Sequence, residues 1–232
     1  FDYIPGITET IGVIPDTLAI ASTLSHPRTC IIDCPQNLNP TPLSMHHLTN
    51  KMADIKYFKQ YLETRYNGKF SFSLSLAILS GLFMLTNTNK SYVNLGVVGS
   101  FTNKNQFRFN NFSAFIIPLY RHKNWDKMCL LERVNDIADK IHKTSKNARG
   151  QLVGNYLATN IYCIDWYTND LVDCLVSCAP TTHPATINGH RANLNEIDMY
   201  GSSSPLYIGW WSANDVIRTT ANCRSSDIKM NN

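Results

Sequence analysis

The chain of 232 residues is long enough for one large domain or two small ones. Hydrophobic residues make up 44% of it and charged residues 16%. The sequence can therefore form a packed core, and this composition excludes a disordered chain and a coiled coil. The 21 basic and 17 acidic residues leave a net charge of +4, which is too small to indicate a nucleic-acid partner.

Prolines recur through residues 1–45, from Pro5 to Pro42. Because proline breaks helices, we predict an irregular arm or connecting segment here, followed by a single α+β domain at 46–232. The chain begins at Phe1 rather than at methionine, so we expect a processed or fragmentary terminus. The longest apolar run, 74–85, is shorter than the roughly 18–20 residues of a membrane span. We expect no membrane span and a cytoplasmic location.

An amphipathic helix is predicted from about Asn50 to Tyr66. Its apolar residues recur at spacings of three and four: Met52, Ile55, Phe58, Leu62 and Tyr66. Thr49 or Asn50 is expected to cap its start, and Asn67-Gly68 is expected to end it.

Two further helices follow from the apolar pattern. The segment 73–85 is apolar nearly all round, so a helix there must be covered by protein on most sides. A third helix is predicted at 126–146, with charged residues opposite one apolar stripe: Met128, Leu131, Val134, Ile137, Ala138 and Ile141.

Strands are predicted where β-branched and aromatic runs are bounded by polar turns, at 92–98, 113–120, 157–164, 171–178, 192–199, 206–211 and 216–221. Helices, then strands, then a long helix and a run of strands is an α+β order. We therefore predict a mixed β-sheet with two to three helices packed on it.

Most motifs of known chemistry are missing from the sequence. It has neither a phosphate-binding P-loop nor a G-x-G-x-x-G pattern, and the turn 201–205 is no nucleophile elbow. Cys174, Cys178, His183 and His190 are metal-ligand types, but two cysteines four apart in a strand lie roughly 13 Å from each other. We predict no metal site. Trp210 and Trp211 should face opposite sides of a strand, with one of them in the core.

The most suggestive local pattern is the pair His46-His47 with Asp54 downstream. A histidine at a junction between a loop and a helix can act as a general base, since its ordinary pKa lies near neutral pH. The alternative interpretation is a pair of loop histidines that pack against Pro42 and Leu43.

Residues 43–67 resemble the junction that carries the H-H-x-x-x-D motif in the CoA-dependent acyltransferase superfamily. This superfamily includes chloramphenicol acetyltransferase, peptide-synthetase condensation domains and wax-ester synthases. His46 and His47 match the histidines, and Asp54 follows at a longer spacing than in the motif. Family members have two similar lobes, and the second histidine of the motif is the general base.

The rest of the chain, to about residue 228, resembles the second lobe of that family in the order of its elements. The apolar helix 74–85 is similar to the one that opens that lobe, and Asn110-Asn111 precedes a strand as a Gly-Asn pair does in the family. Gly209-Trp210 keeps part of the D-F-G-W-G signature of the plant-type branch.

The resemblance implies an acyltransferase-like domain, active or inactive, that would transfer an acyl group from a thioester to a hydroxyl or amine. The implied catalytic residues are His47 as general base, His46 and Asp54, of which Asp54 orients nearby structure. Acyl-CoA or another acyl thioester would be the co-substrate, with no bound cofactor. The implied partner is a second lobe or another protein chain, in a homo-oligomer or a complex.

Composition leaves two other interpretations open. Few Glu, many Asn, Ser and Thr, and a proline-rich arm are also typical of a viral coat or capsid-associated subunit. The arm would then contact neighbouring subunits in the virion. A carbohydrate or peptide binder that uses Trp210 and Trp211 is the third interpretation.

Overall fold

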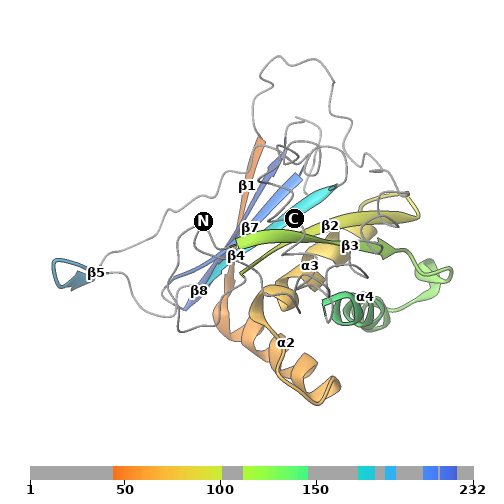
Figure 1. Ribbon diagram of the computed structural model, residues 1–232, viewed down its shortest axis with the longest axis horizontal. Helices are drawn as coiled ribbons and strands as arrows, with labels where there is room; N and C mark the ends of the chain where they lie inside the picture. Colours follow the sequence, from red (N-terminus) through yellow and green to blue (C-terminus); the bar gives the residue numbers. More distant parts are fainter. Residues whose placement is uncertain are drawn as a thin grey trace, which may run out of the picture.

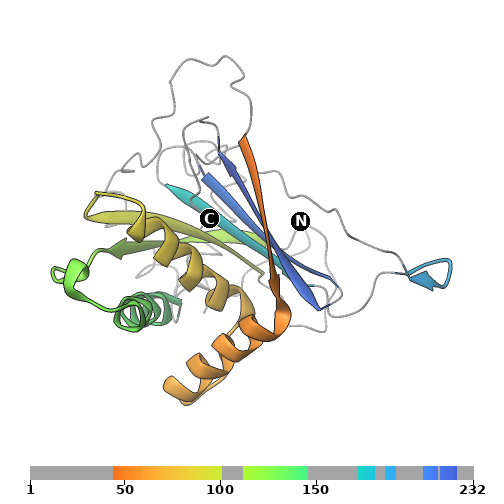
Figure 2. The same cartoon turned by 180° about the vertical axis from the view of Figure 1, so that it is seen from behind.

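The computed structural model describes residues 44–100, 112–145, 172–180, 186–191, 206–213 and 215–223. In these ranges a six-stranded mixed sheet is accompanied by three α-helices, of which the second and third pack on one side of the sheet and the first continues from the end of an edge strand (Figures 1 and 2). This architecture confirms the predicted α+β fold.

The order of strands across the sheet differs from their order along the chain. It is β1 (Ser44–Lys51), β8 (Val216–Cys223), β7 (Leu206–Ala213), β4 (Cys174–Pro180), β2 (Tyr92–Ser100) and β3 (Phe112–Tyr120). The central strand β4 runs parallel to its neighbours β2 and β7, and the other pairs are antiparallel. Among the described strands, β1 and β3 are therefore the two edges of the sheet.

The first helix, α2 (Met52–Arg65), begins directly where β1 ends. Its N-cap residue is Lys51, which makes no side-chain capping hydrogen bond. The expected caps Thr49 and Asn50 are wrong, because both residues belong to β1. The predicted apolar stripe is correct at Met52, Ile55 and Leu62, which are buried against the sheet and the other helices.

The turn after α2 is held by one carboxylate. Asn67 has the left-handed backbone (φ 47°) that was predicted to end the helix. Glu63 accepts hydrogen bonds from Lys59 Nζ at 2.5 Å and from the backbone N–H of Phe70 at 3.1 Å. These contacts, the Lys59 bond first, lower the pKa of Glu63 from its ordinary value of 4.5.

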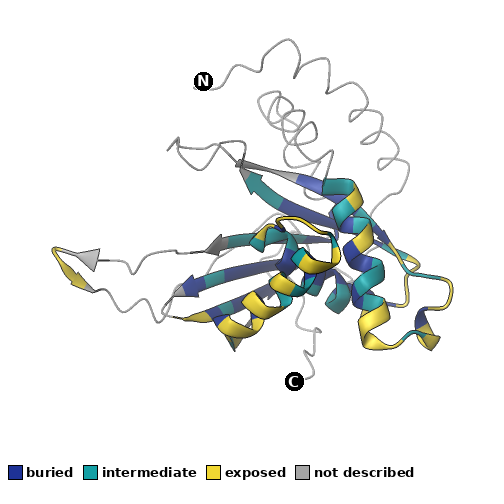
Figure 3. Ribbon diagram, turned by 90° about the horizontal axis from the view of Figure 1, so that it is seen from below, coloured by how far each residue is buried: buried dark blue, intermediate teal, exposed yellow. Residues whose placement is uncertain are grey.

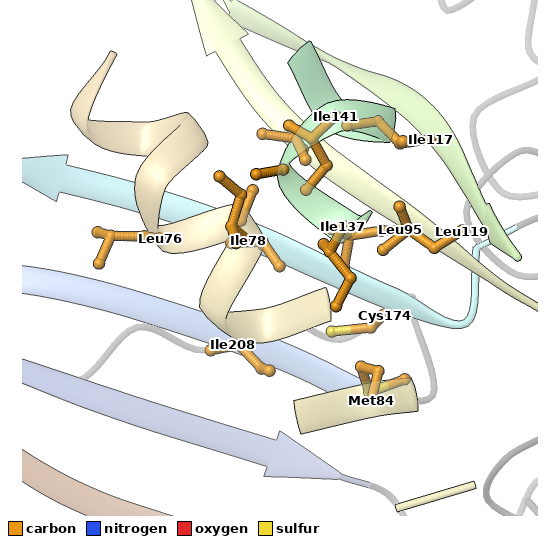
Figure 4. Close-up of a cluster of buried hydrophobic side chains, with 14 of the residues drawn as sticks. Leu76, Ile78, Met84, Leu95, Ile117, Leu119, Ile137, Ile141, Cys174 and Ile208 are labelled. Atoms are coloured by element: carbon orange, nitrogen blue, oxygen red, sulfur yellow. The ribbon is translucent and has the colours of Figure 1, made fainter. Parts of the chain in front are cut away.

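The second helix, α3 (Phe72–Thr86), lies in the middle of the helix layer, as its all-round apolar pattern predicts. Its side chains are buried together with those of the sheet and of the third helix (Figure 4). The packing is tight at Gly81, where a Cβ would lie 2.6 Å from Leu119 Cδ1. On its sheet side Ser80 Oγ accepts a hydrogen bond of 3.1 Å from the indole N–H of Trp210.

The third helix, α4 (Leu130–Ser145), starts four residues later than predicted, after a short 3₁₀ turn, η1 (Trp125–Lys127). Val134, Ile137 and Ile141 are buried as expected. Leu131 was placed on the same stripe, but it is 55% exposed. That placement is wrong because the first turn of α4 extends past the edge of the core, and Figure 3 shows the outer helix surfaces exposed.

The segment before α2 is also different from the prediction. His46 and His47 lie within β1, which pairs with β8 over its full length, and not in a loop at the start of a helix. The sequence alone does not reveal this strand, because residues 44–51 have no clear alternation of apolar and polar side chains.

Several predictions concern residues outside the described ranges: residues 1–43 of the arm predicted at 1–45, and the strands at 157–164 and 192–199. The predicted end of the arm is wrong at Ser44 and Met45, because both residues belong to β1. A small hairpin, β5 (Thr186–Ile187) and β6 (His190–Arg191), was not predicted. Its Asn188-Gly189 turn, with φ of 51° and 78°, is the sequence signal that was missed. None of the helices in the described ranges is long and apolar enough to cross a bilayer.

Candidate functional site

The sheet has two chemically different faces. Leu206, Ile208 and Trp210 of β7 belong to the core that contains the helices. Because side chains alternate along a strand, Tyr207, Gly209 and Trp211 occupy the opposite face. None of the described helices packs on this second face, so we call it, with the residues in register with those three, the helix-free face.

One row of the helix-free face crosses four adjacent strands. His47 of β1 pairs with Thr220 of β8, Thr220 pairs with Gly209 of β7, and Gly209 pairs with Ser177 of β4. Glycine adds no side chain in the middle of this row. The row therefore places a histidine position and two hydroxyl residues on one line, separated by strand spacings of roughly 4.8 Å.

The centre of this face is buried, and its polar side chains lie beside a small apolar cluster of Ile116, Val172 and Leu175. Thr220 is 3% exposed, Asn222 1% and Tyr207 6%. Burial raises the pKa of Tyr207, and a hydrogen bond with the Ser177 side chain opposes part of that shift. At neutral pH the Tyr207 phenol is thus protonated and hydrogen-bonded to Ser177.

The face becomes accessible toward the start of β8. Trp211 and Arg218, which pair with each other, are half-buried, whereas Val216 is 40% exposed. Lys51, which pairs with Val216, is exposed as well. This end of the helix-free face therefore carries two cationic side chains and an indole.

A buried carboxylate lies between β2 and β4. Asp173 is 2% exposed, and its Oδ2 accepts a hydrogen bond of 2.7 Å from the backbone N–H of Asn94. The Asp173 N–H in turn donates to the Asn94 carbonyl at 2.9 Å. Burial, with a contribution from the Asp173 charge, raises the pKa values of Tyr92 and of the Cys174 thiol. Asp173 connects the two strands.

The structure separates the predicted catalytic residues. His46 pairs with Ala221, which packs in the core with the helices, so His46 and His47 occupy register positions of opposite faces. Asp54 is exposed in the first turn of α2. Roughly 13 Å of strand, from His47 to Lys51, precedes that helix. The three residues do not form a compact motif.

The predicted metal-ligand types are also dispersed. Cys174 and Cys178 lie on β4, His190 is exposed in the small hairpin, and His183 lies outside the described residues. Burial raises the pKa of the Cys178 thiol to about 12, with a hydrogen bond from Ser73 opposing the shift. Among the described residues no group of His, Cys, Asp and Glu is arranged to hold a metal ion.

Sequence reasoning missed the polar row of the helix-free face. Ser177 and Tyr207 stand within mostly apolar strands, and Arg218, Thr220 and Asn222 recur at every second position of β8. That spacing in β8 is the signal that could have identified this face. Their pairing across strands is not readable from the sequence, because it depends on the strand order.

The sequence matches no family model and no curated protein. Solved structures do match. The epimerization domain from the third module of tyrocidine synthetase B aligns with 93% of this chain and 51% of that domain, at 11% identity and a TM-score of 0.55. A chain in the complex of the X-domain and OxyB from teicoplanin biosynthesis aligns with 93% of this chain and 48% of its own length, at 8% identity and a TM-score of 0.58.

A third match is the starter condensation domain of rhizomide synthetase, in a mutant form in complex with C8-CoA. It aligns with 94% of this chain and 48% of that domain, at 13% identity and a TM-score of 0.51. At such identities the likeness shows the fold alone. The chain therefore has a fold of the condensation-domain type and spans about half the length of the solved structures that it matches.

Proposed function

We propose that this chain is one lobe of an acyltransferase-like protein, and that the helix-free face forms one wall of its acyl-transfer site. The observation that carries the proposal is the fold match: nearly the whole chain aligns with about half of a condensation or epimerization domain. A cytoplasmic location and a second lobe, on this or another chain, are parts of the same proposal.

In the proposed reaction His47 is the general base. Its imidazole takes the proton of an acceptor hydroxyl or amine, the acceptor atom attacks the thioester carbonyl, and the C–S bond breaks as the new C–O or C–N bond forms. The imidazolium then returns its proton to the leaving thiolate, so atoms and charges balance without a metal or a bound cofactor. The support for this role is the register position of His47 in the row with Thr220 and Ser177.

The other two predicted site residues have smaller parts. Asp54 lies in the first turn of α2, where a carboxylate stabilises the helix start through the helix dipole. We assign it that structural role. His46 pairs with Ala221 at a position of the helix-covered face, so it takes no proton in this scheme and serves as the control for His47.

The thioester donor would approach from the accessible end of the helix-free face. Acyl-CoA carries several phosphate charges, and Lys51 and Arg218 are the cations at that end. The neighbouring Trp211 offers an aromatic ring for a nucleobase. We therefore expect an acyl-CoA, rather than an uncharged ester, as the donor.

The experiment is an acyl-transfer assay that follows thiol release from acyl-CoA, with simple alcohols and amines as acceptors. His47→Ala should lower the rate by roughly 10²–10⁴-fold, whereas His46→Ala should leave it nearly unchanged. Arg218→Ala should raise the KM for acyl-CoA more than it lowers kcat. A wild-type chain that neither binds acyl-CoA nor releases thiol would contradict the proposal, as would equal activity of the His47→Ala variant.

The alternative of a viral coat or capsid-associated subunit rests on composition and on the proline-rich arm. Residues 1–42 lie outside the described ranges, and no feature of the described fold specifically favours that alternative.

A further inference from the structure

The edge strand β1 has a continuous backbone ladder on one side only. It pairs with β8 from Ser44 to Lys51 without a bulge, and no other described strand pairs with it. In an antiparallel pair, alternate residues direct their N–H and C=O groups away from the partner. The outer side of β1 therefore presents backbone groups that a further strand can pair with.

The opposite edge of the sheet is protected. Strand β3 contains Pro118, which has no N–H to donate. At its end, the Tyr120 carbonyl accepts a hydrogen bond of 2.5 Å from Lys140 Nζ of α4. Strand β1 contains no proline, so of the two edges it is the one suited to strand addition.

The middle of β1 carries an exposed apolar side chain. Leu48 is 59% exposed, more than any other large apolar strand residue whose burial the structure describes. A polar partner strand would leave it uncovered, whereas an apolar residue directly opposite would bury it.

A second copy of β1 supplies that residue. A two-fold axis perpendicular to the sheet through Leu48 places Leu48 of both copies opposite each other and keeps all helices on one side. Thr49 then lies opposite His47 of the second copy, and Lys51 lies opposite Met45. Lys51 is the only formally charged residue of β1, so the two lysines lie at opposite ends of the pair and do not repel strongly.

We propose that two copies of this chain associate antiparallel through β1, forming one continuous sheet of twelve strands from the two six-stranded sheets. Helix α2 begins at one end of β1, so the two α2 helices lie at opposite ends of the contact. This association does not depend on acyl transfer. In the dimer, the helix-free faces of the two copies join into one continuous surface.

Sedimentation of the full chain at micromolar concentration tests the proposal. Wild-type protein should be a dimer. Leu48→Lys places two like charges opposite each other and should weaken the dimer about tenfold or more, and Leu48→Glu should do the same. An equimolar mixture of the two variants should regain the dimer, because a lysine then faces a glutamate. That recovery cannot arise from misfolded protein.

Leu131→Lys is the matched control, since Leu131 on α4 is 55% exposed and lies far from the pairing strand in sequence. It should leave the dimer intact. A wild-type monomer, including one that binds a strand of a different protein, would overturn the proposal. A dimer that survives Leu48→Lys unchanged, or variants that fail to pair when mixed, would overturn it as well.

Discussion

Replacing Ile137 and, separately, Leu131 by alanine tests which residues of the apolar stripe of α4 contribute to stability. The pattern places both residues on one stripe, but Ile137 is 0% exposed and Leu131 is 55% exposed. Ile137→Ala removes three carbon atoms, worth about 2.4 kcal/mol of burial at about 0.8 kcal/mol each. Ile137 is tightly packed against α3: its Cγ2 lies only 3.3 Å from the position that a Cβ on Gly81 would take. Removing the side chain therefore leaves a cavity at this contact. We expect a total loss of about 3–4 kcal/mol.

Urea titration of the full chain measures this loss. With a denaturant dependence of about 2 kcal/mol per molar, Ile137→Ala should lower the unfolding midpoint by about 1.5–2 M. Leu131→Ala should change the free energy of unfolding by less than about 0.5 kcal/mol. Equal destabilisation of the two variants, or a smaller loss for Ile137→Ala than for Leu131→Ala, would show that Ile137 does not pack in the core.

Three other predictions follow from buried or hydrogen-bonded groups. Trp210→Phe loses the indole hydrogen bond to α3 and should lower the free energy of unfolding by about 1–2 kcal/mol in urea titration, more than Trp211→Phe does. The hydrogen bond from Lys59 lowers the pKa of Glu63 from its ordinary value of 4.5. The ionised Glu63 carboxylate therefore stabilises the fold above pH 4.5, and this stabilisation is lost as the pH falls below that value. Glu63→Gln should therefore flatten the acid limb of the stability profile. In brief alkylation followed by peptide mass spectrometry, exposed Cys129 should react before Cys178, whose pKa is raised to about 12.

The helix layer is the part of the fold that the sequence predicts best. The apolar residues of 73–85 and 126–146 recur at helical spacing, and burial of one side of a helix requires that spacing. The boundaries are less predictable. Residues 126–129 carry the same pattern as α4, yet the chain forms a short 3₁₀ turn there, and Leu131 extends past the core.

Strand β1 could not be predicted because its stabilisation is not local. Residues 44–51 are mixed in polarity, and they form a strand because their backbone pairs with β8, far away in the chain. The prediction of a loop at His46 and His47 failed for that reason. The same non-local pairing is what brings His47 into one row with Ser177.

The order of strands limits how far the site can be predicted. Alternation within 206–211 indicates that Trp210 and Trp211 have opposite faces, and the structure confirms this with Trp210 in the core. Which polar residues become neighbours depends on β4 lying between β2 and β7. The roles of His47, His46 and Asp54 stay predictions, since they were taken from a motif with altered spacing.

The most direct test of the central claim is a crystal structure of the full chain with a thioether analogue of acyl-CoA. The analogue should lie on the helix-free face, with its thioether beside the row of His47, Thr220 and Ser177 and its phosphates near Lys51 and Arg218. An analogue bound on the helix side of the sheet, or crystals grown at saturating concentration that contain none, would contradict the account.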